Sequence, residues 1–160
     1  MNYIEEAEKY LRNYRHLRGS VETMRRERER LIGKAGPAGE KNMAVALDAV
    51  RGGGRGGKGS AGKYDDAINL IWRIQGLTES IAETEEKLKE IDVLLEEISE
   101  GDGCEFYGRV LRAWYIDGIA KEEIAEEIGY ESRTSIYTIR NRAIRKFAVR
   151  VLGIRALEAI

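Results

Sequence analysis

The side chains with the most chemistry to offer lie together near the C-terminal end of the chain. The stretch from Glu131 to Arg155 holds seven Lys or Arg residues and one acidic residue. Apolar residues recur in it with the period of a helix, which predicts a helix from Ser132 to about Val149 with one buried face. The residues expected to point into the core are Ile136, Ile139, Ala143, Ile144 and Phe147.

The other face of this helix would carry hydroxyl, amide and guanidinium groups. Such groups hydrogen-bond to base edges and to phosphate oxygens of double-stranded DNA. We therefore predict a DNA-binding helix in which threonine, asparagine and arginine side chains contact bases and basic side chains hold phosphates. The predicted DNA-binding residues are Arg133, Thr134, Tyr137, Thr138, Asn141, Arg142, Arg145, Lys146 and Arg150.

The segment before this helix has the features of a helix-turn-helix. KEEIAEEI, from Lys121 to Ile128, predicts a short helix with four acidic residues and one lysine. Ala125 is small enough for two helices to cross there, and Gly129 can take the positive φ that the turn requires. Ser132 is a good N-cap for the second helix. The acidic first helix and the basic second helix indicate that the second one faces a polyanion.

The stretch YGRVLRAWYIDGIAKEEIAEEIGYESRTSIYTIRNRAIRKF resembles region 4 of bacterial sigma factors, mainly through WYIDG, EEIAEEIG and RNRAIRKF. The whole chain looks like the phage and prophage transcriptional regulators of the ArpU and RinA group, in which a helical part precedes a sigma-like module. The resemblance implies a module that binds promoter DNA and an activator of late phage genes. The turn GYESRTSI is one residue longer than in sigma factors, as is common in the phage regulators.

Two upstream segments show the sevenfold spacing of a coiled coil, which predicts two long helices. In the first, the spacing is carried by Tyr3, Tyr10, Leu17, Met24 and Leu31, together with Ala7, Tyr14, Val21 and Arg28. In the second, it is carried by Ile74, Ile81, Leu88 and Leu95, together with Leu77, Thr84, Ile91 and Ile98. The apolar faces can pack against each other as an antiparallel hairpin or against a second copy of the chain, as a homodimer.

A glycine-rich stretch separates these two helices. Residues 33–63 include ten glycines, and we expect Gly33 and the GPAG run after it to end the first helix. The predicted organisation is a first coiled-coil helix over 1–32, a flexible linker over 33–63, a second coiled-coil helix over 64–100 and a DNA-binding domain over 103–160. The predicted fold class is all-α, with a long helical hairpin followed by a sigma-region-4-like helix-turn-helix module.

Several classes of function are disfavoured by the sequence. With one cysteine, Cys104, and one histidine, His16, the chain has no disulfide framework and no typical structural metal site. GRGGKGS lacks the GK[ST] pair of a phosphate-binding loop, and no set of nucleophile, base and acid stands out. We expect no catalytic residues, no metal and no cofactor. Without a signal peptide or a long apolar run, the chain is expected to be cytoplasmic with no membrane partner.

The sequence thus favours a sequence-specific transcriptional regulator that binds promoter DNA, with RNA polymerase as a further partner of the helical hairpin. One alternative is an adaptor that binds polymerase or a sigma factor through the hairpin without touching DNA. Another alternative is a small-terminase-like DNA binder of phage packaging, which would assemble as a ring.

Overall fold

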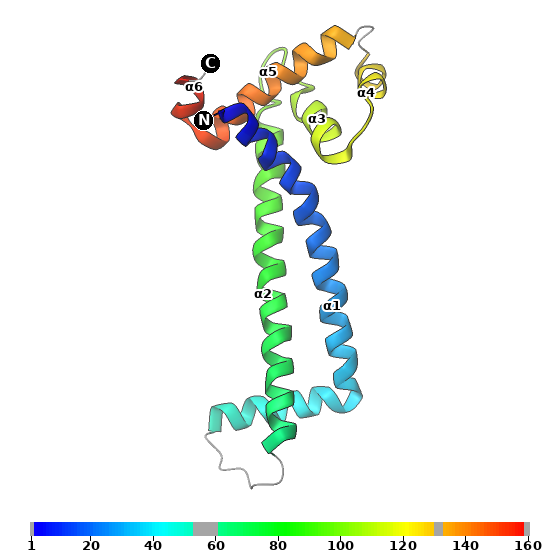
Figure 1. Ribbon diagram of the computed structural model, residues 1–160, viewed down its shortest axis with the longest axis vertical. Coiled ribbons are helices and arrows are strands. Elements are labelled where there is room, and N and C mark those ends of the chain that lie inside the picture. Colours follow the sequence, from blue (N-terminus) through cyan, green and yellow to red (C-terminus); the bar gives the residue numbers. More distant parts are fainter. Residues whose placement is uncertain (1, 53–60, 130–132, 159–160) are drawn as a thin grey trace. The chain divides into compact units, whose positions relative to one another are not determined.

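The computed structural model describes residues 2–52, 61–129 and 133–158, with side chains at 2–35, 65–129 and 135–157. Every regular element in these ranges is helical, which confirms the all-α prediction (Figure 1). The elements are α1 (Tyr3–Gly52), α2 (Ala61–Glu97), α3 (Tyr107–Leu111), the π-helical turn η1 (Arg112–Asp117), α4 (Lys121–Ile128), α5 (Arg133–Leu152) and α6 (Ile154–Glu158).

The prediction that the first helix ends at Gly33 is wrong. Helix α1 continues to Gly52 and α2 already begins at Ala61, so much of the predicted linker is helical. A glycine inside a helix costs only about 1 kcal/mol relative to alanine, and the alanine, lysine and glutamate residues around it favour the helix. Figure 1 shows a bend in α1. A proline inside a helix is a common cause of a bend, because it removes one backbone hydrogen bond.

The chain forms two compact units. One comprises Ser20–Glu85, and the other combines Met1–Gly19 with Glu86–Ile160. Helices α1 and α2 therefore each contribute to both units. The unit that contains residues 103–160 thus also includes the start of α1 and the end of α2, which pack in the same core.

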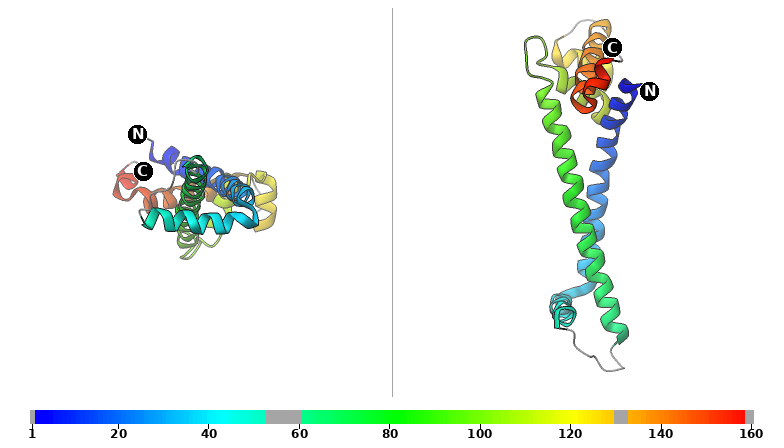
Figure 2. Two further views of the ribbon diagram at one scale, coloured as in Figure 1. Left: turned by 90° about the horizontal axis from the view of Figure 1, so that it is seen from below. Right: turned by 90° about the vertical axis from the view of Figure 1, so that its left-hand side faces the viewer.

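The Ser20–Glu85 unit is stabilised by apolar residues that recur with the predicted sevenfold spacing. Val21 and Leu31 of α1 and Ile74 and Ile81 of α2 are buried. At the rim, Glu27 forms an ion pair of 3.3 Å with Arg73 of α2, and Arg25 pairs with Glu85. Moving forward in α1 from Arg25 to Glu27, the partner in α2 moves back from Glu85 to Arg73, so the two segments run antiparallel (Figure 2).

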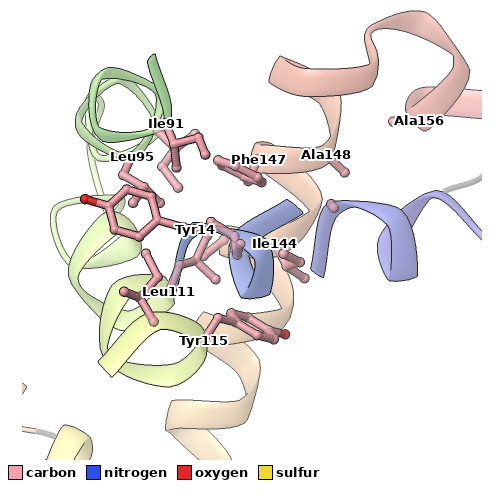
Figure 3. Packing of buried hydrophobic residues seen from close by; sticks show 14 residues of the cluster. Tyr14, Ile91, Leu95, Leu111, Tyr115, Ile144, Phe147, Ala148 and Ala156 are labelled. Atoms are coloured by element: carbon pink, nitrogen blue, oxygen red, sulfur yellow. The ribbon is translucent and has the colours of Figure 1, made fainter. Parts of the chain in front are cut away.

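The other unit has a core to which five helices and η1 contribute. Its buried residues come from the start of α1, the end of α2, α3, η1, α5 and α6 (Figure 3). They are Ala7, Leu11, Tyr14, Ile91, Leu95, Ile98, Leu111, Tyr115, Ile116, Ala143, Ile144, Phe147, Ala148 and Ala156. Burial of this much apolar surface is the main stabilising term of the unit. We call these 19 and 75 residues at the two ends of the chain the head unit.

A polar bridge ties three elements of the head unit together at the edge of this core. Asp92 of α2 accepts hydrogen bonds from the Tyr14 hydroxyl of α1, at 2.9 Å, and from Arg112 of η1, at 2.6 Å. The Arg112 guanidinium also lies 5.6 Å from the centre of the Tyr14 ring. The start of α1 is thus bound to the end of α2 and to η1 by specific contacts as well as by apolar packing.

Among the described helices, none has a run of apolar residues long enough to span a lipid bilayer.

Candidate nucleic-acid interface

Helix α4 and the glycine that ends it have the geometry that the sequence predicted. Helix α4 spans Lys121–Ile128, as expected, and Gly129 caps it with a φ of 79°. That left-handed conformation costs an L-residue with a Cβ roughly 1–2 kcal/mol, which explains why a glycine stands here. Ala125 is buried at 6% exposure, beside Ile124 and Ile128. Ser132, the predicted N-cap of α5, lies outside the described residues.

Helix α5 turns its apolar face inward as predicted. Ile136, Ala143, Ile144 and Phe147 are buried, and Ile139 is half-buried. Ile136 belongs to a second apolar cluster, which also contains Val110, Ala113, Ile124, Ala125 and Ile128. The N-terminal half of α5 therefore packs on α3, η1 and α4, while its C-terminal half packs in the core of the head unit.

The opposite face of α5 is exposed and polar. Thr138, Asn141, Arg142 and Arg145 are all exposed. Among the described residues, the side chains of Asn141, Arg142 and Arg145 form no hydrogen bond or ion pair with the rest of the chain. Their amide and guanidinium donors therefore point into solvent, where an external acceptor could reach them.

A shallow groove of about 440 Å³ runs along this face, lined by Arg142, Arg145, Lys146, Val149 and Arg150. Two of the cations contact the last residue of α2 or the segment that follows it. Lys146 donates a hydrogen bond of 2.8 Å to the backbone carbonyl of Glu100, and Arg150 lies 3.4 Å from Glu97. The Arg150 pair is solvent-exposed, at 47% and 38%, and such pairs contribute little stability, so a phosphate can replace the carboxylate.

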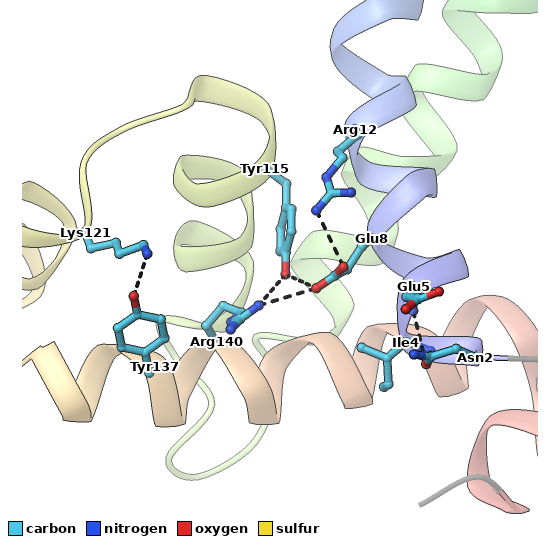
Figure 4. Close-up of polar contacts among 9 residues, drawn as sticks. All are labelled: Asn2, Ile4, Glu5, Glu8, Arg12, Tyr115, Lys121, Tyr137 and Arg140. Atoms are coloured by element: carbon cyan, nitrogen blue, oxygen red, sulfur yellow. Dashed lines mark hydrogen bonds and ion pairs between the residues drawn. The ribbon is translucent and has the colours of Figure 1, made fainter.

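Tyr137, one of the predicted DNA-binding residues, does not lie on the fully exposed face of α5. Its side chain is half-buried in the second cluster, with its ring edge-on to Trp114 at 5.3 Å. Its hydroxyl accepts a hydrogen bond from Lys121, whose ammonium also lies 5.2 Å from the Trp114 ring centre (Figure 4). Helical spacing put Tyr137 near the border of the two faces, and the apolar area of its ring favours the buried side.

Arg133 and Thr134 lie in α5 by their backbone, but their side chains lie outside the described residues. The predicted contacts of these two residues with DNA stay predictions.

A charged cluster on the buried side of α5, formed by Glu8, Tyr115 and Arg140, was not predicted from the sequence. The carboxylate of Glu8, in α1, accepts hydrogen bonds from the Tyr115 hydroxyl at 2.8 Å and from Arg140 at 3.4 Å (Figure 4). Arg140 also donates to the Tyr115 hydroxyl at 3.1 Å. Burial raises the pKa of Tyr115 to about 12, and its hydrogen bond to Glu8 acts in the same direction. The cluster could have been noticed from Arg140 alone, because this residue falls between Ile136 and Ile144 on the apolar face.

Within the part of the chain that the structure describes, His, Cys, Asp and Glu side chains form no group that could hold a metal ion. The side chains of the exposed α5 face are hydrogen-bond donors and cations, without an arrangement of nucleophile and base. The chemistry that they support is recognition of anions and of hydrogen-bond acceptors.

Comparison with models of protein families, with curated proteins and with solved structures gave no match to this chain.

Proposed function

We propose that the protein is a sequence-specific transcriptional regulator that binds double-stranded DNA through α5, as the resemblance to sigma region 4 and to the phage regulators implies. The observation that carries this proposal is the exposed face of α5, where Asn141, Arg142 and Arg145 present donors with no partner in the described part of the chain. A helix fits the major groove of B-form DNA, and its side chains there reach the base edges.

In this proposal the residues of α5 divide into two roles. Thr134, Thr138, Asn141 and Arg142 contact base edges, since asparagine and arginine form the bidentate pairs with adenine and guanine. Arg133, Arg145, Lys146 and Arg150 hold phosphates and set the position of the helix along the groove. The groove lined by Arg142, Arg145, Lys146 and Arg150 supports the second role.

The long helices α1 and α2 form, in this proposal, an antiparallel hairpin that carries the DNA-binding module and contacts RNA polymerase or a second copy of the chain. A dimer would present two α5 helices and would favour a repeated half-site about one DNA turn apart. The mass of the full chain in solution distinguishes a monomer, a dimer and the ring expected of a packaging protein.

The test of the function is enrichment of binding sites from a pool of duplex DNA with a randomised core. We expect the full-length protein to enrich a defined sequence. Substitution of both Asn141→Ala and Arg142→Ala should weaken binding to it by ~10- to 100-fold or more, because each good base contact contributes roughly 1–3 kcal/mol. The matched control is Asn13→Ala with Arg18→Ala, which removes the same two groups from the exposed surface of α1.

Salt dependence separates this function from an adaptor that works through apolar contacts. Binding to the enriched duplex should weaken steeply as the salt concentration rises, since counterions return to the phosphates. If no sequence is enriched, or if the double substitution binds as tightly as wild type, the proposal is wrong.

A further inference from the structure

The charged cluster of Glu8, Tyr115 and Arg140 joins residues that are far apart in the sequence. Glu8 lies in the second turn of α1 and Arg140 in the middle of α5, 132 residues later. Both side chains are mostly shielded, at 16% and 21% exposure. Three hydrogen bonds, of 2.8, 3.1 and 3.4 Å, connect the carboxylate, the phenol and the guanidinium (Figure 4).

Arg140 is held on its other sides by aromatic rings. Its guanidinium carbon lies 4.8 Å from the centre of the Trp114 ring and 5.8 Å from that of Tyr137. The Nε atom of Arg140 is buried and has no hydrogen-bond partner among the described residues. An arginine with a buried, unsatisfied donor is costly to keep in this place, so apolar side chains would stabilise the site more easily.

The cluster constrains how far α5 can rotate about its own axis. Apolar packing is nondirectional and tolerates small rotations of a helix about its axis. A charge-assisted hydrogen bond in a shielded place depends strongly on distance and angle. Asn141 and Arg142 follow Arg140 directly in the helix, so a rotation that moved Arg140 away from Glu8 would also turn their side chains.

We propose that Glu8 is a positioning residue for α5. Through Arg140 and Tyr115 it sets the rotation of α5, and hence the angle at which Asn141 and Arg142 meet base edges. The inference rests on the proposed DNA-binding function. It assigns the N-terminal helix a part in sequence recognition without any contact to DNA.

Unspecific and sequence-specific DNA binding should respond differently to a change at Glu8. Binding to unrelated DNA depends mainly on the number of positive charges near the phosphates. Binding to a preferred sequence depends in addition on the placement of the base-contacting side chains. A change at Glu8 should therefore weaken binding to the preferred sequence and spare binding to unrelated DNA. Glu8 lies in α1, is mostly shielded and adds no positive charge near the phosphates.

The experiment compares full-length Glu8→Gln with wild type on two probes, the enriched duplex and an unselected random duplex of the same length. We expect about tenfold weaker binding to the enriched duplex. Binding to the random duplex should be unchanged or slightly tighter, since one negative charge is lost. Glu5→Gln is the matched control, because it makes the same change on the exposed surface of the same helix and should bind both probes like wild type.

Two further variants keep the test decisive if Glu8→Gln lowers stability. Arg140→Lys retains the positive charge but loses the planar group that meets both Glu8 and Tyr115, so it should show the same selective loss. Glu8→Gln with Arg140→Gln removes both charges and should lose less affinity for the enriched duplex than the two single changes add up to. Circular dichroism at the binding temperature identifies variants that are folded.

The outcomes distinguish the inference from the function on which it rests. If folded Glu8→Gln and Arg140→Lys both bind the enriched duplex like wild type, the positioning role is wrong and the function stands. Equal loss on both probes also contradicts it, because that pattern indicates a general loss of the fold. If wild-type protein enriches no sequence at all, both proposals are overturned together.

Discussion

At the scale of single residues, the head unit uses charged and phenolic groups where apolar ones would pack more simply. Glu8 accepts hydrogen bonds from Tyr115 and Arg140, while Asp92 joins Tyr14 to Arg112. Breaking such a shielded pair from one side leaves a charge without a partner and is far more costly than removing both groups. The first group, around Glu8, links α5 to α1 and η1 through directional hydrogen bonds. Because it includes the phenol of Tyr115, the stability of the head unit depends on pH.

The pKa of Tyr115 predicts how stability depends on pH in alkaline solution. Its folded-state pKa is raised from 10.0 to about 12, first of all by burial. Stability from this group is therefore complete below pH 10, where the phenol is neutral in both states. It is lost as the pH rises through about 12, because the unfolded chain releases the proton first.

Urea unfolding of wild type and Tyr115→Phe checks this expectation. Below pH 10 wild type should be more stable by about 1 kcal/mol, the usual contribution of one hydrogen bond. Between pH 10 and pH 12 that advantage should shrink, because phenylalanine cannot ionise. A difference in unfolding free energy that stays constant over this range would contradict the assigned environment of Tyr115.

At the scale of elements, the sequence predicted those parts whose structure is decided by near neighbours. The bounds of α4, the positive φ of Gly129 and the inward face of α5 all follow from local pattern and turn chemistry. Tyr137 was misplaced because its environment depends on Trp114, which lies 23 residues earlier in η1. The end of α1 was misplaced because glycine lowers helix stability only slightly, and several good helix formers follow it.

Gly108 illustrates an element contact that sequence patterns do not reveal. A Cβ on this residue would collide with the backbone carbonyl of Leu95 and lie 2.7 Å from the hydroxyl oxygen of Ser99. That hydroxyl also accepts a hydrogen bond of 2.9 Å from the Gly108 N–H. Helix α3 can thus approach the end of α2 this closely only because residue 108 has no side chain.

We therefore expect Gly108→Ala to lower the free energy of unfolding by about 1–3 kcal/mol, since the backbone of one of the two helices must shift. Gly19→Ala is the control in the same unit. No atom lies within 4 Å of its added Cβ, so it should raise stability by ~0.5–1 kcal/mol through helix propensity alone. Thermal unfolding of both variants measures the difference, and equal melting temperatures would refute the close approach.

At the scale of the whole molecule, no pattern in the sequence indicates that the head unit includes both ends of the chain. Contacts such as Glu8 with Arg140 join positions 132 residues apart, and no local pattern indicates which distant residues will meet. The sevenfold spacing predicted that Ala7, Tyr14 and Ile91 would be buried, but not that they would share a core with Leu111 and Phe147. The head unit is therefore composite, and α1 and α2 are part of it.

This composition predicts which fragments of the protein can fold. A fragment of residues 103–160 lacks Ala7, Leu11, Tyr14, Ile91, Leu95 and Ile98, which supply much of the core. Domains of about 60 residues are only marginally stable even with a complete core, and this one would expose Leu111 and Phe147 as well. We expect it to show no cooperative unfolding transition and a poorly dispersed NMR spectrum.

A second, shortened chain should fold. It replaces residues 20–85 by about six glycine and serine residues, which can span the roughly 8–10 Å between neighbouring helices. Gly19 and Glu86 belong to the same unit, and Tyr14 already bonds to Asp92 across the two helices, so the ends to be joined lie on adjacent segments. This chain keeps all 14 buried residues of the core and should unfold cooperatively.

If the 103–160 fragment folds as well as the shortened chain does, α1 and α2 are dispensable for the head unit. The opposite result would mean that any minimal folded form of the head unit must carry the start of α1 and the end of α2, because the core around α5 is incomplete without them.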